Sequence, residues 1–531
     1  MTITRGDRPF RARRSTPFGA LACLSVLLFF VASCSGSATS SFGTAQESSE
    51  TSQEEEKVGA ASATDRPNMI FVLTDDLDLA SVQKMPEINS LLRDEGVSFE
   101  NAFISHPICC PSRSTILTGL YDHNHNVLRN RPPDGGFQKF VSEGHEEDSI
   151  AVHLQEGGYQ TGFFGKYLNG YTKADPTHVP PGWNEWYGKI NEQDLYDYSL
   201  NENGEEVSYG SDPENFFTDV LSGKATEFVR EAAPEDQPFF AYVAPTAPHG
   251  PATPAERHKG AFADEEAPRP PSFNEEDVSD KPSGIRNSEP LSKGAISGID
   301  DRYQTRLESM LAVDEMVASL VEELEAAGEL DNTYIFFTSD NGFEQGEHRI
   351  QVGKDRPYEE SARVPFFVRG PEVAAGSDVE QLAVNTDFAP TFADLASVEF
   401  QADGRSLAPL LRGEEPPWRS SVLLEKLSAE DNEEEVNSKG KSKAKGKAKG
   451  KGKAQSGAED SPTFEAIRTD THKYVEYDNG DVELYDLEAD PYELESIHES
   501  ADPALLEDLK ARLEVLKSCS EVGCREAEDS P

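Results

Sequence analysis

The chain has 531 residues, which is enough for two domains and a large buried core. Its formal net charge is −49 at pH 7, and this argues against a nucleic-acid partner, because phosphate binding needs clustered lysine and arginine. A solvated acidic surface of this kind keeps a protein soluble.

The first 34 residues are predicted to be an export signal rather than part of the fold. A basic segment at residues 5–14 precedes an apolar run at residues 18–32, which is too short for a comfortable membrane span. The run ends at Val31-Ala32-Ser33-Cys34, which resembles a bacterial lipoprotein cleavage site with Cys34 as the lipid-bearing residue. An ordinary signal peptide is the alternative. In either case we expect an exported protein: extracellular, anchored by lipid at the cell surface, or periplasmic.

Residues 35–66 are predicted to be a disordered tether. They are rich in Ser, Thr, Glu and Ala and contain almost no aromatic residues, so they cannot bury enough apolar surface to offset chain entropy. If Cys34 carries lipid, this tether spaces the folded protein from the membrane, which the chain then contacts only through that anchor.

The fold is predicted to begin with a buried parallel strand at residues 68–74. Its apolar run ends in Asp75 and Asp76, at the end of the strand where open α/β sheets bind their ligands. Two adjacent carboxylates repel each other, so a hard divalent cation is the simplest partner, and a solvated turn is the alternative. Apolar residues with helical spacing at 85–92 predict the next helix.

A cysteine-containing stretch follows, His106-Pro-Ile-Cys-Cys-Pro-Ser-Arg-Ser-Thr-Ile-Leu-Thr-Gly119. Pro111 is favoured as a first helical residue, and residues 112–117 then predict a short helix that ends at Gly119. Cys109 would lie at the helix N-terminus, where backbone N–H groups favour negative charge, and Arg113 adds a cation one turn on. Cys109 is therefore a candidate nucleophile beside an anion pocket, and a buried inert cysteine pair is the alternative.

This stretch resembles the signature of the type I sulfatases, Cys-x-Pro-Ser-Arg followed by Leu-Thr-Gly. The resemblance extends over about residues 67–525. It implies an α/β, alkaline-phosphatase-like fold with a large, mostly parallel central sheet flanked by helices. It also implies a catalytic domain at residues 67–418 and a small C-terminal α+β subdomain at residues 419–525.

The histidines that follow, His123 and His125, are predicted either to reach the mouth of the pocket or to lie in solvent. A helix is expected from Ile150 to Gly157 and a strand at residues 160–169, with Lys166 as a second candidate cation. Many sulfatases have Gly-Lys-Trp-His at this strand, whereas Gly165-Lys166-Tyr167-Leu168 resembles the branch of N-acetylglucosamine-6-sulfatases and extracellular heparan 6-O-endosulfatases. Asn169, His123 or His125 could replace the missing histidine.

Residues 216–233 are predicted to form an amphipathic helix, and residues 238–245 a buried strand that leads to His249. Imidazole can give a proton to a leaving alcohol near neutral pH, so His249 is the candidate general acid, with an exposed loop histidine as the alternative. Residues 252–300 are predicted to be a long surface loop that shapes substrate access. A long helix is expected at residues 302–327.

The strand at residues 333–339 repeats the pattern of the first one, because it ends in Asp340 and Asn341. Together with the earlier pair of carboxylates, these residues supply four oxygen donors at adjacent strand ends, enough to begin a calcium site. His348 is a candidate substrate contact. Lys354, in Gly-Lys-x-x-x-Tyr-Glu, matches a sulfate-binding lysine of the family. A strand at residues 365–369 and a helix at 390–398 complete this domain.

The C-terminal subdomain is predicted from a strand at residues 421–425, a hairpin at 473–485 and a final helix at 505–516. Cys519 and Cys524 are expected to form a small-loop disulfide in an oxidising compartment, and residues 526–531 to form a tail. Residues 438–456 are Lys-rich and predicted to be a disordered insert. This insert is either a tolerated loop insertion or a flexible arm for a sulfated polyanion.

The resemblance also implies a mechanism. In the family the first signature cysteine is oxidised to formylglycine, so Cys109 is expected to be modified by a formylglycine-generating enzyme. One hydroxyl of its hydrate attacks sulfur, and the second later expels sulfate. One calcium ion would be held by Asp75, Asp76, Asp340, Asn341 and the modified residue 109. Arg113 would hold the hydrate, Lys166 the sulfate, and His249 or Lys354 would protonate the alcohol.

The predicted function is hydrolysis of sulfate monoesters, with 6-O-sulfated N-acetylglucosamine in glycans, or a small sulfate ester, as substrate. One alternative is a general arylsulfatase, or a phosphate or phosphonate hydrolase of the same superfamily. Another is a non-catalytic surface lipoprotein that binds sulfated glycans through the Lys-rich insert.

Overall fold

The computed structural model describes residues 66–173, 175–190, 194–428 and 462–530. The predicted signal peptide, Cys34, nearly all of the tether and the Lys-rich insert lie outside these ranges. Within them, no helix combines the length and the apolar character that a membrane crossing requires.

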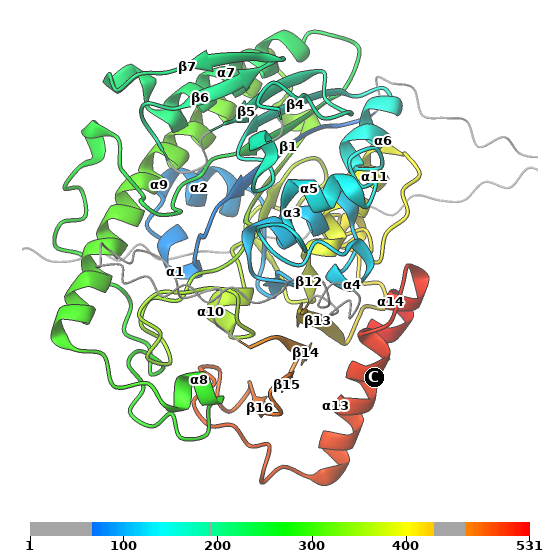
Figure 1. The fold of residues 1–531 in the computed structure, drawn as a ribbon. Helices are drawn as coiled ribbons and strands as arrows, with labels where there is room; N and C mark the ends of the chain where they lie inside the picture. The colour runs from blue at the N-terminus through cyan, green and yellow to red at the C-terminus, as the bar shows by residue number, and fades with distance from the viewer. Residues whose placement is uncertain (1–65, 174, 191–193, 429–461, 531) are drawn as a thin grey trace, which may run out of the picture. The chain divides into compact units, whose positions relative to one another are not determined.

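A large sheet forms the centre of the described chain (Figure 1). The strands from β9 to β5 in its middle run parallel, and antiparallel strands extend it toward β7. In spatial order, the strands are β11 (Ser377–Val379), β2 (Val97–Phe99), β10 (Phe367–Arg369), β9 (Thr333–Ser339), β1 (Asn68–Thr74), β8 (Phe239–Ala244), β4 (Gln160–Gly165), β5 (Glu185–Lys189), β6 (Ser199–Glu202) and β7 (Glu205–Ser208).

Helices cover both faces of this sheet, which confirms the expected α/β architecture. The helices on one face are α3 (Cys109–Thr118), α5 (Gly136–Ser142), α6 (Ile150–Glu156), α11 (Phe388–Ala396) and α12 (Ala408–Leu411). The segments on the other face are α1 (Leu79–Val82), α2 (Pro86–Ile88), the π-helix η2 (Asn89–Arg93), α7 (Phe217–Ala232) and α9 (Lys293–Ala327).

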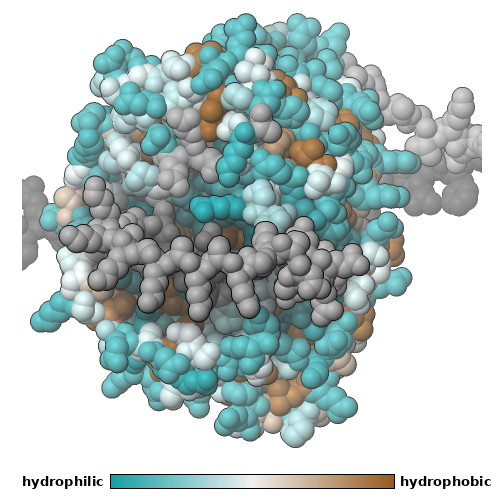
Figure 2. Space-filling view, viewed as in Figure 1, coloured by the Kyte–Doolittle hydropathy of each residue, from teal (hydrophilic) through white to brown (hydrophobic). Residues whose placement is uncertain are grey.

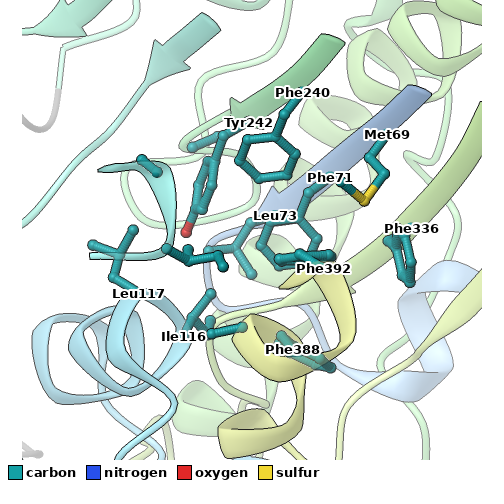
Figure 3. Packing of buried hydrophobic residues seen from close by; sticks show 14 of the residues in the cluster. Met69, Phe71, Leu73, Ile116, Leu117, Phe240, Tyr242, Phe336, Phe388 and Phe392 are labelled. Carbon is teal, nitrogen blue, oxygen red and sulfur yellow. The ribbon is translucent and has the colours of Figure 1, made fainter. Parts of the chain in front are cut away.

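Strand β1 is buried on both sides, which explains its unbroken apolar sequence. Because successive side chains point to opposite faces, Phe71 and Leu73 join one apolar cluster, while Ile70 and Val72 join the other. Figure 3 shows Phe71 among the rings of neighbouring elements. Its ring centroid lies 5.0 Å from that of Tyr242, and its ring also packs against Phe388 and Phe392 of α11.

The pairing of the central strands brings their polar ends to one edge of the sheet. Thr74 at the end of β1 lies opposite Ser339 at the end of β9, so the two oxygen-rich dipeptides that follow these strands are adjacent. Asp75 also forms an isolated parallel bridge with Pro248, beyond the end of β8. The edge therefore collects Asp75, Asp76, Asp340, Asn341 and the segment that carries His249.

Several elements differ from the sequence-based expectation. Strand β4 ends at Gly165 rather than residue 169, because Gly165 has φ +117° and turns the chain toward the site. Helix α9 begins at Lys293 rather than residue 302, with Ser292 as its capping residue. Of residues 293–302 only Ile299 is buried, so these turns carry little apolar periodicity. Strands β5, β6 and β7, which extend the sheet, were not expected.

The C-terminal part forms a separate antiparallel sheet in the order β13 (Ser421–Lys426), β14 (Phe464–Thr469), β15 (His472–Tyr477), β16 (Val482–Asp486). Helices α13 (Pro503–Leu516) and α14 (Val522–Glu528) follow, and Cys519 is joined to Cys524 by a disulfide. Residues 526–528, expected in a tail, instead belong to α14. The Glu528 carboxylate is buried there and accepts from Tyr121 and pairs with Arg419.

Short elements connect these layers. They are β3 (Ala102–Phe103) paired with β12 (Ala383–Val384), helices α4 (Asp122–His125), α8 (Ser283–Arg286) and α10 (Glu359–Ala362), and the 3₁₀ turns Tyr171–Lys173, Pro213–Asn215, Glu256–His258, Leu330–Asn332 and Asn385–Asp387. The described residues seen in Figure 2 are mainly hydrophilic, with hydrophobic ones scattered among them, as the composition leads one to expect.

The packing around Phe71 predicts a large loss of stability on truncation. Phe71→Ala removes a ring that is fully buried between two elements, and we expect it to lower the free energy of unfolding by about 3–5 kcal/mol. Val515→Ala, on an exposed face of α13, is the control and should change it by less than about 0.5 kcal/mol. Urea unfolding followed by circular dichroism measures both, and equal midpoints for the two variants would contradict the packing argument.

Candidate active site

The site is built around Cys109, the first residue of helix α3. The helix starts two residues before Pro111, the expected first residue, and Pro111 lies within its first turn, where a missing N–H costs no hydrogen bond. It ends at Gly119, whose φ of +69° and close approach to Ala402 both favour glycine. Every residue of α3 is buried, so the helix fixes Cys109 rigidly at the polar edge of the sheet.

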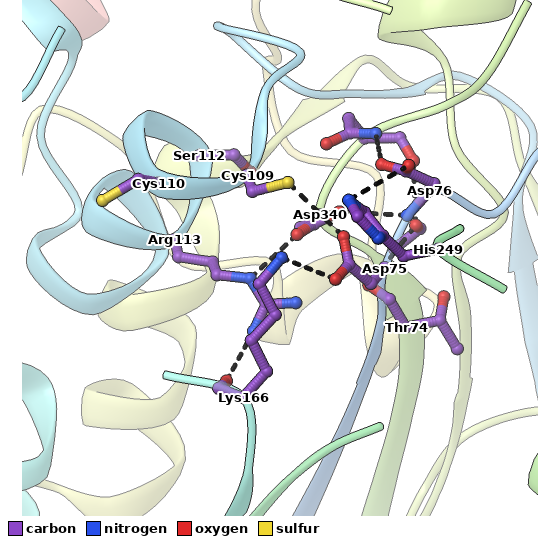
Figure 4. Close-up of polar contacts among 12 residues, drawn as sticks. Thr74, Asp75, Asp76, Cys109, Cys110, Ser112, Arg113, Lys166, His249 and Asp340 are labelled. Atoms are coloured by element: carbon purple, nitrogen blue, oxygen red, sulfur yellow. Dashed lines mark hydrogen bonds and ion pairs between the residues drawn. The ribbon is translucent and has the colours of Figure 1, made fainter. Parts of the chain in front are cut away.

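Carboxylates and cations alternate around Cys109 (Figure 4). The Cys109 Sγ atom lies 3.4 Å from Asp75 Oδ1, and Lys166 Nζ lies 2.6 Å from the other oxygen of Asp75. Arg113, one turn along α3, donates from Nε to Asp340 Oδ2 at 2.8 Å. It also donates from Nη1 to the Lys166 carbonyl oxygen at 2.7 Å, so α3 and the end of β4 hold each other in place.

Lys354 enters the same cluster from the loop that follows β9. Its Nζ atom lies 2.9 Å from Cys109 Sγ and also donates to Asp76 Oδ1. Asn341 Nδ2 donates to that Asp76 oxygen at 2.8 Å. The predicted residues of the centre therefore come together at the start of α3 and just beyond the ends of β1, β4 and β9, although they are far apart in the sequence.

His249 lies at the more open side of the cluster. Its Nε2 atom is 3.9 Å from Asp76 Oδ2, and its Nδ1 atom contacts the Gly250 carbonyl oxygen at 2.8 Å. The His249 side chain is 19% exposed, whereas those of Asp75 and Asp76 are 1% exposed. Of these three side chains His249 is the most exposed, which suits a group that exchanges a proton with a bound ligand.

Burial and neighbouring charges act on the carboxylates in opposite directions. Burial alone would raise the pKa of the Asp75 carboxyl, but Lys166 and other nearby cations hold it well below its usual value. Burial and the charge of Asp75 raise the pKa of Asp340, despite Arg113. Burial and Asp75 also raise the pKa of the Cys109 thiol to about 12, so this thiol is protonated and weakly nucleophilic at neutral pH.

The residues present fit a divalent cation. Asp75, Asp76 and Cys109 each offer a ligand atom to one small cluster, together with His249. The buried Asp76 Oδ2 and Asn341 Oδ1 atoms accept no hydrogen bond from the described residues, which leaves two oxygen atoms open to a cation. Carboxylate and amide oxygens are the donors that hard divalent ions prefer.

The other predicted contact residues are held by protein groups. The His123 ring lies 3.0 Å from Glu425 Oε1 and 3.0 Å from the Cys519 carbonyl oxygen, so it joins α4 to the C-terminal part. His125 contacts Thr115 Oγ1 at 3.0 Å. The His125 side chain is fully buried and also pairs with Asp122 at 3.1 Å, and its contact with a ligand stays a prediction.

The His348 side chain is also fully buried, and its Nδ1 atom contacts Glu275 Oε2 at 2.8 Å; its contact with substrate stays a prediction. Asn169 is partly buried and accepts a hydrogen bond at its backbone oxygen from Phe137. Leu168, which stands where many sulfatases have histidine, packs in the apolar core.

Two buried residues of the site were missed by sequence reasoning. Arg306, in the middle of α9, donates from Nη2 to the Asp76 carbonyl oxygen at 2.5 Å and pairs with Asp78 at 3.0 Å. It thereby holds Asp76 in a left-handed conformation, with φ +69°. His106, three residues before Cys109, contacts both Asp122 and Asp355. Neither residue has a local sequence signal, because its partners are distant in the chain.

Comparison with known proteins agrees with this geometry. Residues 67–398 match the Sulfatase family. The chain is 35% identical over 485 residues to the N-acetylglucosamine-6-sulfatases of Capra hircus and of Homo sapiens. These alignments cover 88% of this chain and 86% and 87% of the relatives, respectively.

A solved structure extends the comparison to the fold. It is described as a complex with its substrate D-glucosamine-2-N,6-O-disulfate, and it superimposes with a TM-score of 0.69 at 25% identity, over 88% of this chain and 99% of that one. The alkaline-phosphatase-like fold expected from the signature is thus confirmed. The chain belongs to the sulfatase family and is a sulfuric ester hydrolase.

Proposed function

We propose that this sulfatase removes 6-O-sulfate from N-acetylglucosamine-type residues of sulfated glycans. Its similarity to two N-acetylglucosamine-6-sulfatases over most of both chains supports this substrate class. So does the solved structure whose named substrate is a 6-O-sulfated glucosamine. The observation that carries the chemistry is the contact of Cys109 with Lys354 and Asp75 at the start of α3.

Cys109 is proposed to be converted to formylglycine, which supplies a hydroxyl nucleophile when its aldehyde is hydrated. The chain surrounds this position with Lys166, Arg113 and Lys354, whose positive charges can hold the sulfate oxygens and stabilise the charge that develops on them. Because these side chains are buried and hydrogen-bonded, they need little rearrangement when a sulfate ester enters.

The leaving alcohol needs a proton, and His249 is the proposed donor. Its ring lies on the more exposed side of the cluster, opposite the helix that carries Cys109 (Figure 4). Lys354 is the other candidate, because its ammonium group contacts Cys109 Sγ directly. A group placed within hydrogen-bond reach of the departing oxygen is the geometric requirement for general acid catalysis.

One Ca²⁺ is proposed to bind Asp75, Asp76, Asp340, Asn341 and the modified residue 109. Such an ion adds positive charge where three carboxylates are buried together, and it would polarise the nucleophile and the sulfate. The two oxygen atoms of Asp76 and Asn341 that lack hydrogen bonds support this assignment.

The cellular setting is also a proposal. Residues 1–34 would direct export, with or without lipid at Cys34, and a formylglycine-generating enzyme would be the partner that modifies Cys109. A disulfide between Cys519 and Cys524 suits an oxidising compartment. The strongly acidic composition supports a glycan or small-ester substrate rather than a nucleic acid. For the Lys-rich insert we favour a tolerated loop insertion over an arm that binds a sulfated polyanion.

Calcium binding predicts a ligand-dependent gain in stability. After treatment with a chelator, Ca²⁺ at 100 times its dissociation constant should stabilise the protein by about 2.7 kcal/mol, seen as a higher unfolding temperature. Asp340→Asn should lose more than half of this shift, while the exposed Asp175→Asn should keep it. If the Asp340 variant shifts as much as the parent protein, the proposed ligand set is wrong.

Sulfate release is the direct test of the function. With Ca²⁺ present, the enzyme should release inorganic sulfate from oligosaccharides that end in 6-sulfated N-acetylglucosamine. Cys109→Ala should lower kcat by about 10³-fold or more, and Lys354→Ala by about 10²-fold, because each removes a group from the reacting centre. Lys139→Ala, which breaks only a partly exposed ion pair on α5, is the control.

The outcomes separate the alternatives. Release from an aryl sulfate alone would keep the sulfatase chemistry and reject the glycan substrate. Near-normal turnover in Cys109→Ala would reject the nucleophile. Peptide mass spectrometry of residue 109 accompanies each assay, so that an unmodified cysteine is recognised as the cause of inactivity.

A further inference from the structure

The loop that carries Lys354 is held in an unusual backbone conformation. Lys354 lies between β9 and α10 in a stretch without regular secondary structure. The next residue, Asp355, has φ +69°, which a residue with a Cβ atom rarely adopts. Such a conformation is strained and persists only where surrounding contacts impose it. The contacts of Asp355 therefore show what fixes Lys354.

Three groups from other elements hold Asp355. Its backbone N–H donates to the Pro107 carbonyl oxygen at 2.9 Å. Its Oδ1 atom lies 2.9 Å from His106 Nε2, and its Oδ2 atom lies 2.6 Å from Lys426 Nζ. These side chains are buried, so the interactions are shielded from water and stronger than ion pairs at the surface.

The contacts continue as a buried row of alternating charges. On its other nitrogen His106 contacts Asp122, so the row runs Asp122, His106, Asp355, Lys426. Burial alone would lower the pKa of His106, but Asp122 and Asp355 together raise it to about 9. The ring is then an imidazolium at neutral pH and donates to both carboxylates. Each carboxylate in the row is flanked by a cation.

This row connects the small C-terminal sheet to both sides of the reacting centre. Lys426 is the last residue of β13, and its neighbour Glu425 donates its backbone N–H to the Ser105 carbonyl oxygen at 2.8 Å. His106 lies three residues before Cys109, and Asp355 directly follows Lys354. The same row of charged groups therefore borders both partners of the 2.9 Å contact between Lys354 Nζ and Cys109 Sγ.

We propose that His106, Asp355 and Lys426 are positioning residues that hold Lys354 against residue 109, with Lys426 supplied by the C-terminal sheet. This inference rests on the proposed role of Lys354 in turnover. It assigns the C-terminal sheet a part in positioning, because Lys426 at the end of β13 contacts the Asp355 carboxylate directly at 2.6 Å. Loss of that contact should shift Asp355, and with it the neighbouring Lys354.

The test compares neutral and conservative variants of the row. Lys426→Met and Asp355→Asn should each lower kcat by about 10–100-fold, since a displacement of about 1 Å at a reacting group has effects of this size. KM should change by less than about threefold, because substrate binding does not depend on Lys354 alone. Lys426→Arg keeps the charge and should recover most of kcat. All rates are divided by the formylglycine content of residue 109, measured by mass spectrometry.

Two controls separate positioning from folding. Lys517→Met removes the ion pairs of another lysine of the C-terminal part, with Glu465, Glu476 and Glu514, and should leave kcat within about twofold of the parent. The double variant Lys426→Met with Asp355→Asn should be no slower than the slower single variant, because both changes break one chain of contacts. If Lys426→Met does not fold, Asp355→Asn, which keeps the size of the side chain, carries the same comparison.

Three results would overturn the inference. The first is an unchanged kcat in Lys426→Met and Asp355→Asn while Lys354→Ala is inactive; the proposed function then stands. The second is a loss of kcat in Lys426→Met or Asp355→Asn that is fully explained by the fraction of unfolded protein, or a loss in Lys426→Met that Lys426→Arg does not recover. The third is a near-normal kcat in Lys354→Ala, which would also reject the proposed role of Lys354.

Discussion

The structure depends on the mutual neutralisation of charges that are buried together at one edge of the central sheet. Three carboxylates, those of Asp75, Asp76 and Asp340, lie out of water and would repel one another if left alone. Lys166, Arg113 and Lys354 make their burial possible, and each comes from a different element. The order of the strands, the start of helix α3 and the course of the loop after β9 all serve to bring these cations to the carboxylates.

The part of the site that follows strand ends could be predicted from the sequence. Unbroken apolar runs such as residues 68–74 and 333–339 predict buried strands of a sheet that is covered on both faces. The pairing of these two strands places the polar residues that follow them side by side. The helix that begins at Cys109 also has local signals, namely Pro111 in its first turn and Gly119 at its end. In these segments local chemistry and tertiary structure agree, so the clustering of these residues at one edge of the sheet was predictable.

The rest depends on partners that are distant in the sequence. Nothing near His348 indicates that Glu275, 73 residues earlier, will bury it. Asp122 lies only three residues before His125, but nothing in that segment indicates that the pair will be fully buried. A histidine in a loop is equally compatible with a ligand contact and with a buried ion pair until its partner is known. Arg306 was missed for the same reason, since a polar residue in a long helix is usually solvated. The early start of α9 was not predicted because, of residues 293–302, only Ile299 is buried.

The burial of Cys109 also has a consequence for the order of events when the protein is made. Only 1% of this residue is accessible, and the helix around it is closed on all sides. If another enzyme modifies Cys109, as proposed above, this burial requires the modification to precede the folding of the domain around the cysteine. The last described helix, α14, takes part in this enclosure. Glu528 contributes its carboxylate to Arg419 and to Tyr121, which follows α3 closely in the chain but lies 407 residues before Glu528, so a distant segment helps to close the structure around Cys109.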